Sequence, residues 1–281
     1  MIYIHIPYCK QKCSYCNFHF STSLQSKDDF LLALHKEIEF RKHELPNNNL
    51  QTLYFGGGSP SILSIGELNR IIEKIQKYFH FNNDIEITLE ANPDDLNNKY
   101  VKELAQTPIN RLSIGVQSFH DEDLQLMNRA HNAAQADSCI KRVQDAGLEN
   151  ISIDLIYGNP SANSEIWKNN LQKTINLQIP HISSYALTVE PKTALNQWVK
   201  TGKIKSPNEN QQNEDFFWMS NFLKENRFEH YEISNFALPN YYSKHNTAYW
   251  QNQAYLGLGP SAHSFDGNRK RSWNVSNNIQ F

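Results

Sequence analysis

The chain opens with Ile2-Tyr3-Ile4-His5-Ile6-Pro7-Tyr8-Cys9-Lys10-Gln11-Lys12-Cys13-Ser14-Tyr15-Cys16, an alternating apolar run that leads directly into three cysteines. The β-branched and aromatic residues before Pro7 predict a short strand at residues 2–7. The cysteines follow in a single loop with the spacing C-x3-C-x2-C. Because three metal-ligating side chains come directly after this strand, we expect a functional site at its carboxyl end.

Further β-rich runs continue this pattern and alternate with segments whose apolar residues have helical spacing. The predicted strands after the first are residues 52–55, 86–90, 111–115, 151–156 and 181–187. Strands that alternate with helices predict an α/β fold with a parallel sheet or barrel. After about residue 187 the alternation fades into Asn-rich and aromatic sequence, which indicates a smaller second region.

Unusual residues recur near the carboxyl ends of these strands. Gly56-Gly57-Gly58-Ser59-Pro60 follows the second strand, Glu90 ends the third and Gln117 follows the fourth, while Asp154 lies within the fifth and Tyr185-Ala186 near the end of the sixth. Ligands bind at this edge of parallel sheets, so the pattern predicts one shared pocket. Taken singly, the glycine run equally indicates a tight turn, and the polar residues equally indicate hydrogen bonds to strand-end backbone.

Three cysteines in one loop favour an iron–sulfur cluster. Three thiolates hold three irons of a [4Fe-4S] cubane and leave the fourth iron open for a small molecule, and S-adenosylmethionine (SAM) suits that position. A structural zinc site is the alternative, with His19 or Cys139 as the fourth ligand. A disulfide is less favoured in a reducing compartment. Cys139 stands apart in a helical pattern, where we expect a small buried residue.

Composition excludes several classes of function. The 281 residues have a formal charge of −2, so no general attraction to nucleic acid or anionic membranes is expected, and Arg269-Lys270-Arg271 is expected to be a solvated loop. The sequence has no run of about 18 apolar residues and no basic segment before an apolar signal core, which predicts a cytoplasmic protein without stable membrane insertion.

The motifs together resemble the oxygen-independent coproporphyrinogen III oxidase-like radical SAM proteins. The resemblance covers essentially the whole chain. It rests on residues 3–9, the C-x3-C-x2-C loop through Phe18, and residues 56–60, 89–93, 115–119, 128–131, 154–158, 245–250 and 257–263. The chain departs from the family pattern at Ser59, where relatives carry threonine, and at Asn159, where they carry leucine.

The resemblance implies a partial (β/α)6 TIM-like barrel at residues 1–190 and a smaller C-terminal extension at residues 191–281. Family members continue into a further helical domain, so we expect this chain to be a piece of a longer protein. The cluster ligands implied are Cys9, Cys13 and Cys16. The SAM contacts implied by the matching motifs are Tyr3, Tyr15, Gly57, Gly58, Ser59, Glu90, Gln117, Arg129, Asp154 and Ala186.

Two branches of this family differ in function, the oxidase HemN and the heme chaperone HemW. The oxidase carries an additional cysteine where this chain has Phe18, and the His245-Asn246-Thr247-Ala248-Tyr249-Trp250 segment resembles the chaperone branch. The resemblance implies binding of heme, with His245 as candidate ligand, and transfer of heme to acceptor proteins. The alternatives are decarboxylation of coproporphyrinogen III in porphyrin biosynthesis, a zinc-stabilised TIM-like hydrolase, and for His245 a histidine that fixes a loop against Trp250.

Overall fold

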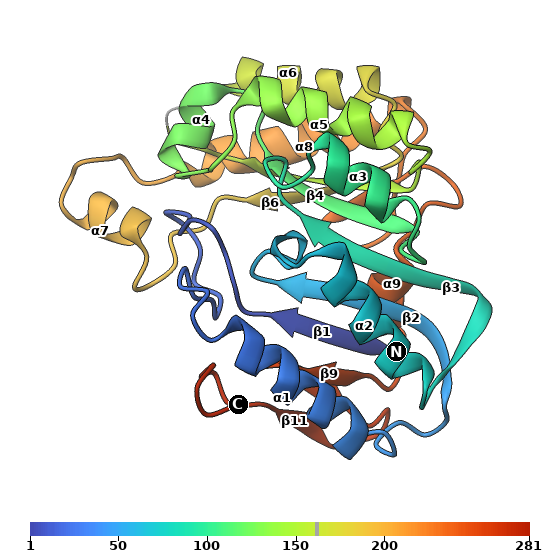
Figure 1. Ribbon diagram of the computed structural model, residues 1–281. Coiled ribbons are helices and arrows are strands. Elements are labelled where there is room, and N and C mark those ends of the chain that lie inside the picture. Colours follow the sequence, from blue (N-terminus) through green and yellow to red (C-terminus); the bar gives the residue numbers. More distant parts are fainter. Residues whose placement is uncertain (161–162) are drawn as a thin grey trace.

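A computed structural model describes residues 1–160 and 163–281 (Figure 1). Six parallel strands form its centre, as the sequence predicts. They pair in the order of the sequence, each with the next. Their bounds are β1 Ile2–Ile6, β2 Asn49–Gly57, β3 His80–Ala91, β4 Arg111–Gln117, β5 Ile151–Tyr157 and β6 His181–Ala186.

Four of these strands, β2 to β5, are longer than the sequence predicts, and β2 and β3 differ most. β2 and β3 extend toward their amino ends, where Asn49 pairs with His80 and Leu50 with Phe81 before the register shifts. The added residues are mostly exposed and polar, so they lack the apolar run on which the prediction depended. Gln117, predicted to follow the fourth strand, is the last residue of β4.

Most of the helices follow the strands and cover the outer face of the sheet, whereas α7 lies away from it and α9 lies on the inner face (Figure 1). Alternate residues of the strands, such as Ile4, Phe55 and Leu89, are fully buried in the same core as Leu34 and Ile71 of two of these helices. The helices are α1 Lys27–Phe40, α2 Ile65–Gln76, α3 Asn98–Leu104, α4 Asp121–Leu126, α5 Ala133–Asp145, α6 Ser164–Asn176, α7 Ala194–Lys200, α8 Glu209–Glu225 and α9 Lys244–Trp250, with a 3-10 turn at Pro60–Ile62.

The last ninety residues add strands to both edges of this sheet. β8 (Asn235–Ala237) pairs antiparallel with β6, and β7 (Glu229–His230) pairs with β8. β9 (Leu256–Leu258) pairs parallel with β1, and β10 (His263–Phe265) and β11 (Arg271–Trp273) form a separate two-stranded sheet. Within the described residues β7 and β9 stay unpaired with each other, so the barrel is partial and open.

The inner face of the sheet carries the other half of the strand residues, and these are largely polar. Side chains in a strand alternate between faces, so the apolar outer set fixes an inner set that includes Tyr3, Thr52, Glu90, Arg111 and Asp154. α9 lies against this face beside β2 (Figure 1). The fold therefore places a column of polar groups inside the partial barrel. The cysteine loop lies at the end of this column where the strands have their carboxyl ends.

Candidate functional site

Backbone hydrogen bonds hold the cysteine loop against the end of the sheet. Gly58 N donates to Ile6 O at 2.8 Å and Ser59 N to Tyr8 O at 2.7 Å, which tie the glycine turn to the chain leaving β1. On the other side of the loop, Ser14 Oγ donates to Leu126 O at 2.7 Å, and Leu195 N of α7 donates to Ser14 O at 2.8 Å. The loop is therefore fixed from both sides.

The loop opens on a cavity of about 160 Å³ at the carboxyl ends of the strands. The cavity brings together residues from the loop, the glycine turn and the ends of β3, β4 and β5, as one shared pocket requires. Eleven of the fourteen predicted site residues line it, namely Cys9, Cys13, Tyr15, Cys16, Gly57, Gly58, Ser59, Glu90, Gln117, Arg129 and Asp154.

Two glycines of the turn have no room for a side chain. Gly57 has φ +108°, and a Cβ there would lie 2.5 Å from Nδ1 of His5. A Cβ on Gly58 would lie 2.6 Å from the carbonyl oxygen of Tyr8. These glycines let the backbone pack tightly against β1 and its loop, and their peptide groups line the cavity without side chains between.

Arg129 connects the cysteine loop to the strands. Its Nη1 donates to Cys13 Sγ at 3.2 Å, and its Nη2 donates to Asn92 Oδ1 at 2.7 Å and to Gly115 O at 2.8 Å. Its buried Nε has no hydrogen-bond partner among the described residues. A fixed guanidinium with spare donor capacity suits an anionic group such as a carboxylate.

Two buried carboxyl groups face the cavity from β3 and β5. Glu90 accepts from Tyr54 OH at 2.8 Å and from Gly57 N at 3.1 Å. Burial, followed by the charge of Asp154, raises the pKa of Glu90 to about 7. Burial raises the pKa of Asp154 to about 6, although Ser113 Oγ donates to it at 3.2 Å. A cationic ligand would favour the ionised form of both groups.

The three thiols of the cysteine loop could serve as ligands of a metal centre, and binding of the metal would remove their protons. Cys9, Cys13 and Cys16 are free and partly exposed, and burial raises the pKa of Cys9 to about 11. Metal ligation requires thiolates, so an iron centre would displace these protons on binding. Three thiols of one loop beside a cationic Arg129 fit the charge of a cluster with thiolate ligands.

The zinc alternative lacks at this cavity both fourth ligands that the sequence offered for it, His19 and Cys139. Cys139 is fully buried in α5, as predicted, and its thiol donates to Ala136 O. His19 Nε2 is hydrogen-bonded to Asn278 Oδ1 at 2.7 Å, and neither residue lines the cavity. Among the described residues no three His, Cys, Asp or Glu side chains are grouped closely enough to hold a metal ion, the three loop thiols included, so the choice between zinc and a cluster depends on the fourth ligand. The donor set fits a cluster better than zinc.

Three predicted site residues lie outside the lining. Tyr3 lies below the cavity on β1, where its ring stacks on Tyr54 at 6.0 Å and its hydroxyl is 3.2 Å from His5 Nδ1. Ala186 ends β6. His245 lies in α9, against the inner face of the sheet. Sequence motifs alone placed these three residues with the others.

His245 is enclosed by the protein itself. It is 1% exposed, with Nδ1 2.7 Å from Thr52 Oγ1 and Nε2 3.0 Å from Tyr249 OH. Its ring lies 4.9 Å from that of Tyr54, and burial lowers its pKa to about 3. Both ring nitrogens are therefore occupied, an arrangement that agrees with a histidine that fixes α9. Heme ligation by His245 stays a prediction and would require breaking the bond at one ring nitrogen.

Sequence reasoning missed Asn92 as a pocket residue. Its Oδ1 accepts from Arg129 and its Nδ2 donates to Ser59 Oγ at 2.7 Å, so it joins two predicted SAM contacts. Its place directly after β3, inside the motif at residues 89–93, was the available signal. Ser113 and Gly115 on β4 were also missed, because a buried serine or glycine in a strand has no distinctive pattern.

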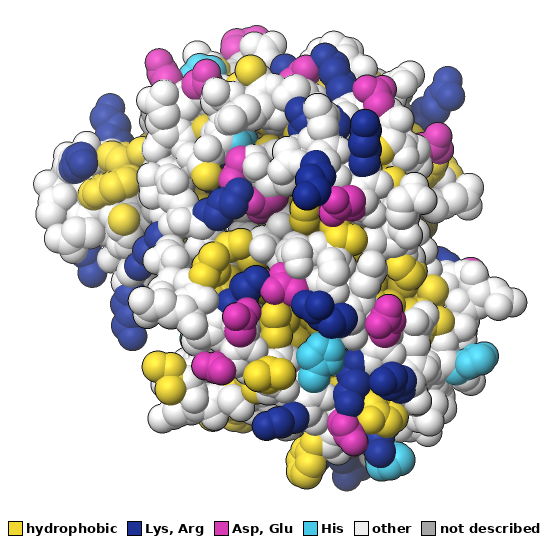
Figure 2. Space-filling view, viewed as in Figure 1, with side chains coloured by type: hydrophobic (Ala, Val, Ile, Leu, Met, Phe, Trp, Pro, Cys, Tyr) yellow, Lys and Arg dark blue, Asp and Glu magenta, His cyan; other side chains and the backbone are white. Residues whose placement is uncertain are grey.

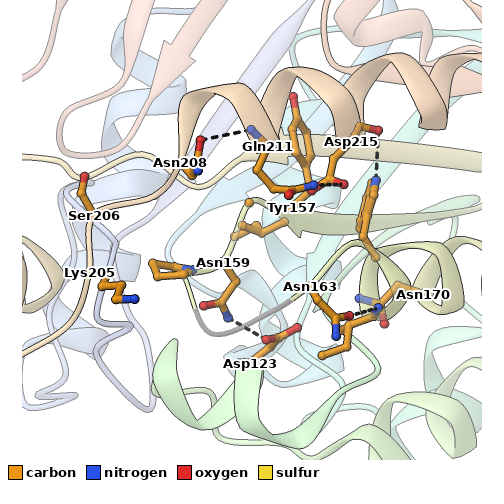
Figure 3. Close-up of a pocket in the computed structure, with 15 residues that line it drawn as sticks. Asp123, Tyr157, Asn159, Asn163, Asn170, Lys205, Ser206, Asn208, Gln211 and Asp215 are labelled. Carbon is orange, nitrogen blue, oxygen red and sulfur yellow. Dashed lines mark hydrogen bonds between the residues drawn. The ribbon is translucent and has the colours of Figure 1, made fainter.

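A second cavity, of about 290 Å³, lies between the β5–α6 loop and α8 (Figure 3). Its polar side chains bond one another, as Asn159 Nδ2 does with Asp123 Oδ1 at 2.8 Å and Gln211 Nε2 with Asp215 Oδ1 at 3.1 Å. Asn159, where relatives carry leucine, thus supplies a buried hydrogen bond that leucine could not make. These hydrogen bonds explain why polar side chains line this cavity without requiring a ligand.

Comparisons with known proteins agree with this geometry. The profile of the Radical SAM superfamily matches residues 3–172. The heme chaperone HemW of Lactococcus lactis is 36% identical over 94% of this chain and 69% of its own length, and that of Bacillus subtilis is 35% identical over 94% and 70%. The coproporphyrinogen III oxidase HemN of Escherichia coli superposes with a TM-score of 0.86 at 26% identity, over 100% of this chain and 67% of that one.

A further relative lies outside the bacteria. The mitochondrial radical S-adenosyl methionine domain-containing protein 1 of Danio rerio is 31% identical over 93% of this chain and 59% of its own length. No helix of the described residues is long and apolar enough to cross a membrane. The match at residues 3–172 contains the cysteine loop and seven further predicted site residues of the cavity, from Gly57 to Asp154. The chain belongs to the oxygen-independent coproporphyrinogen III oxidase-like radical SAM family, in its HemW branch.

Proposed function

We propose that this chain is a cytoplasmic heme chaperone that binds a [4Fe-4S] cluster, SAM and heme, and that it passes heme to acceptor proteins. The proposal depends on one observation: three loop thiols, Arg129 and two buried carboxyl groups line the same cavity. Membership in the radical SAM superfamily implies the cluster and SAM. When bound, such a cluster supplies the low-potential electron needed to cleave the sulfonium of SAM.

The lining residues divide by chemistry into cluster ligands and SAM contacts. Cys9, Cys13 and Cys16 would ligate three irons. Arg129 would pair with the SAM carboxylate, and carbonyl oxygens of the Gly57–Gly58 turn would accept from its amino group. Glu90 and Asp154 would accept hydrogen bonds from ribose or amino groups. Tyr3, Tyr15, Ser59, Gln117 and Ala186 complete the proposed SAM set.

The α9 segment is the proposed heme region. Trp250 is 58% exposed and Tyr249 37% exposed, so both offer aromatic surface to a flat porphyrin. His245, about one turn earlier on the same helix, is the candidate iron ligand. It would need to free one ring nitrogen, for instance by leaving Tyr249 while Nδ1 keeps Thr52, at a cost of about 0.5–1.5 kcal/mol for the broken hydrogen bond. Heme binding here would therefore include a rearrangement of α9.

A second candidate function is the oxidation of coproporphyrinogen III, because the solved HemN structure superposes over the whole chain. Phe18 favours the chaperone, since the sequence resemblance implies a further cysteine there in the oxidase. Phe18 is 71% exposed beside the thiols, so a cysteine at this position would face the same cavity.

One experiment separates the two functions. The cluster is reconstituted under anaerobic conditions, and heme binding by absorbance and porphyrinogen decarboxylation by product analysis are measured on the same sample. We expect a stoichiometric heme complex and no decarboxylated product. Turnover of the porphyrinogen without heme binding would reject the chaperone. Heme binding by Trp250→Ala and His245→Ala, compared with Trp273→Ala as an exposed aromatic control on β11, would locate the site.

A further inference from the structure

A line of hydrogen-bonding side chains crosses the inner face of the sheet, starting at the SAM cavity. In the register of β5 and β6, Asp154 lies opposite Ser183, and Ser152 lies opposite His181. Residues two apart on a strand share a face, so all four side chains lie on the inner side. Ser152, Ser183 and His181 are buried, and of the four Asp154 alone lines the cavity.

These side chains are hydrogen-bonded in series. Burial raises the pKa of Asp154, and hydrogen bonds from Ser113 and Ser183 oppose that rise. Ser152 Oγ lies 3.3 Å from Ser183 Oγ and 2.6 Å from His181 Nδ1. On the other side of the ring, His181 Nε2 lies 2.7 Å from Tyr231 OH. The series therefore joins the cavity to the turn between β7 and β8, where Tyr231 lies.

Tyr231 brings the series to the surface of the protein. It is partly exposed, unlike the three residues before it. Its hydroxyl oxygen accepts from Ser243 N at 3.2 Å, and its ring stacks on that of Tyr242 at 4.6 Å. These contacts fix the side chain and use only the oxygen, so the hydroxyl hydrogen is left for His181 or for water. The outer end of the series thus lies where water can take or supply a proton.

The groups between the two ends can each donate and accept. A serine hydroxyl does both, and a neutral imidazole has one N–H donor and one acceptor nitrogen. Burial, followed by the charge of Arg111, lowers the pKa of His181 well below its ordinary value, so the ring is neutral. Hydrogen bonds in such a series polarise one another, so a change at Asp154 is transmitted to Tyr231.

Near neutral pH, Asp154 is the member of the series that changes its charge. Burial raises its pKa to about 6, whereas burial raises the pKa of Tyr231 to about 12 and keeps that hydroxyl neutral. A proton that Asp154 releases into the series must therefore leave it at the other end. The titratable groups that interact by charge with these ends are Tyr54, Glu90, Arg111, Arg129 and Tyr185 at Asp154, and Glu86, Arg111 and Glu232 at Tyr231.

Asp154 needs a second way out for its proton when the cavity is filled. Acidic side chains on the helix-covered face stand at the surface, where water exchanges their protons directly (Figure 2). Asp154 is half-buried on the inner face and lines the cavity assigned to SAM. SAM in that cavity would separate Asp154 from the solvent, while its cationic sulfonium favours the carboxylate and so expels the proton.

We propose that Ser183, Ser152, His181 and Tyr231 form a proton relay between Asp154 and the solvent beside β8. The proposal rests on the proposed function, since the relay serves Asp154 when SAM covers it. The proton of Asp154 passes to Ser183 while each group hands its own proton to the next, and Tyr231 gives one proton to water. One proton leaves in total, Asp154 becomes a carboxylate, and His181 changes from its Nε2–H to its Nδ1–H tautomer without becoming charged.

The first test follows the tautomer of His181 in the reconstituted protein before SAM is added. Nitrogen NMR of isotope-labelled histidine distinguishes the two tautomers from each other and from the charged ring. Between pH 5 and pH 8 we expect His181 to change from Nε2–H to Nδ1–H, with a midpoint near the pKa of Asp154 of about 6. Ser152→Ala and Asp154→Asn should each hold one tautomer throughout. A tautomer that does not depend on pH in the unmodified chain, or that still changes in Ser152→Ala, would overturn the relay.

The second test measures proton transfer with SAM bound. A light-released acid lowers the pH within microseconds, and infrared spectroscopy follows the carboxyl band that is missing in Asp154→Asn. We expect protonation to slow at least about tenfold in Ser152→Ala and to recover in Ser152→Thr, which keeps the hydroxyl. The matched control is Ser184→Ala, which should stay within about twofold. Ser184 lies on the opposite face of β6, and its buried hydroxyl has no hydrogen-bond partner among the residues that the structure describes.

The outcomes separate the relay from the proposed function. If SAM does not bind, the proposed function fails, and the tautomer measurement still tests the relay, in the cluster-free chain if no cluster forms. Tyr231→Phe removes the outer end of the series without changing β5, and it should slow the same step if Ser152→Ala does not fold. Equal protonation rates in both variants and the unmodified chain would show that the proton leaves through the cavity, and would overturn the relay. An equal loss of rate in Ser184→Ala would overturn it as well.

Discussion

The inner face of the sheet carries two polar clusters that differ in whether they line the cavity at the cysteine loop. At the carboxyl end, Arg129 Nε has no partner in the described residues, and the pKa values of Glu90 and Asp154 are raised to about 7 and 6. At the other end, both ring nitrogens of His245 are bonded, and Glu86 accepts from the backbone of Lys244 and His245. Arg111 Nε, beside Glu86, also lacks a hydrogen-bond partner among the residues described, so the clusters differ chiefly in the cavity that opens beside the first. We infer that the first cluster binds ligands and that the second holds α9 in place.

The largest effect is expected from a substitution in the polar cluster at the carboxyl end. Cys13→Ala should abolish cluster assembly, because a cubane held by two thiolates loses an iron ligand and the contact with Arg129. Cys139→Ala is the matched control, since that thiol is buried in α5 away from the cavity. Visible absorbance after anaerobic reconstitution measures both. Equal absorbance in Cys13→Ala and the unmodified chain would contradict the assignment of the loop cysteines as cluster ligands.

Substitutions in the polar cluster around His245 should instead change the stability of the folded chain. His245→Ala removes a fully buried ring and leaves Thr52 and Tyr249 without their partner, so we expect a loss of about 2–4 kcal/mol in the free energy of unfolding. Urea denaturation of the cluster-free chain measures it. Cys13→Ala should change that quantity by less than about 1 kcal/mol. A neutral result for His245→Ala would mean that α9 does not depend on this side chain.

The protonation of His245 gives the same cluster a pH signature. Burial lowers its pKa from 6.5 to about 3, so the unfolded chain binds a proton in this interval that the folded chain does not. Stability contributed by the neutral ring is thus present above pH 6.5 and is lost as the pH falls toward 3. Urea midpoints between pH 7 and pH 4 should show a smaller pH dependence in His245→Ala than in the unmodified chain. Parallel curves would contradict this assignment.

Arg129 tests the ligand side of the comparison. Arg129→Gln should weaken SAM binding about ten- to a hundredfold, because it removes the cation proposed to pair with the SAM carboxylate. Arg129→Lys should restore little, since one ammonium cannot replace three fixed bonds to Cys13, Asn92 and Gly115. Calorimetry with SAM on reconstituted protein measures both variants, with cluster content as the control. Unchanged affinity would place the SAM carboxylate elsewhere.

The buried carboxyl groups predict a smaller, pH-dependent effect. SAM carries a cationic sulfonium, so it binds best when Glu90 and Asp154 are ionised, and its affinity should rise about five- to tenfold between pH 6 and pH 8. In the ligand-free chain the raised pKa values have the opposite consequence: the stability contributed by these two protonated groups is fully present below about pH 4 and is lost as the pH rises to 7. Glu90→Gln should flatten both profiles. A flat profile before substitution would argue against ionisation in this window.

The smallest effect concerns Ser59. Its hydroxyl accepts from Asn92 Nδ2 at 2.7 Å, and threonine, the residue of relatives, keeps that oxygen. Ser59→Thr should therefore change SAM affinity by less than about twofold, whereas Ser59→Ala should weaken it more because Asn92 then loses a partner. Calorimetry of the two variants in parallel measures the difference. Equal losses would show that the added methyl group, rather than the hydroxyl, decides the outcome.

The sequence predicted the carboxyl-end site better than the rest of the molecule, for a physical reason. Thiols, glycine turns and strand-end acids such as Glu90 have distinctive residue types, and the α/β pattern assigns them to one edge. Asn92 and Ser113 were missed because small polar residues satisfy many environments. The enclosure of His245 depends on Thr52, which lies 193 residues away in the sequence, and no local pattern encodes that contact, although the contact with Tyr249 four residues on is a local helical one. Edge pairing of β8 and β9 was equally invisible, since three-residue strands carry little periodicity.

The most direct measurement is the metal content and electron paramagnetic resonance spectrum of anaerobically reconstituted protein, reduced by one electron, with and without SAM. We expect about four iron and four sulfide per chain and a signal whose shape changes when SAM is added. A single zinc ion without sulfide, or a cluster signal indifferent to SAM, would contradict an open iron site in the loop after β1.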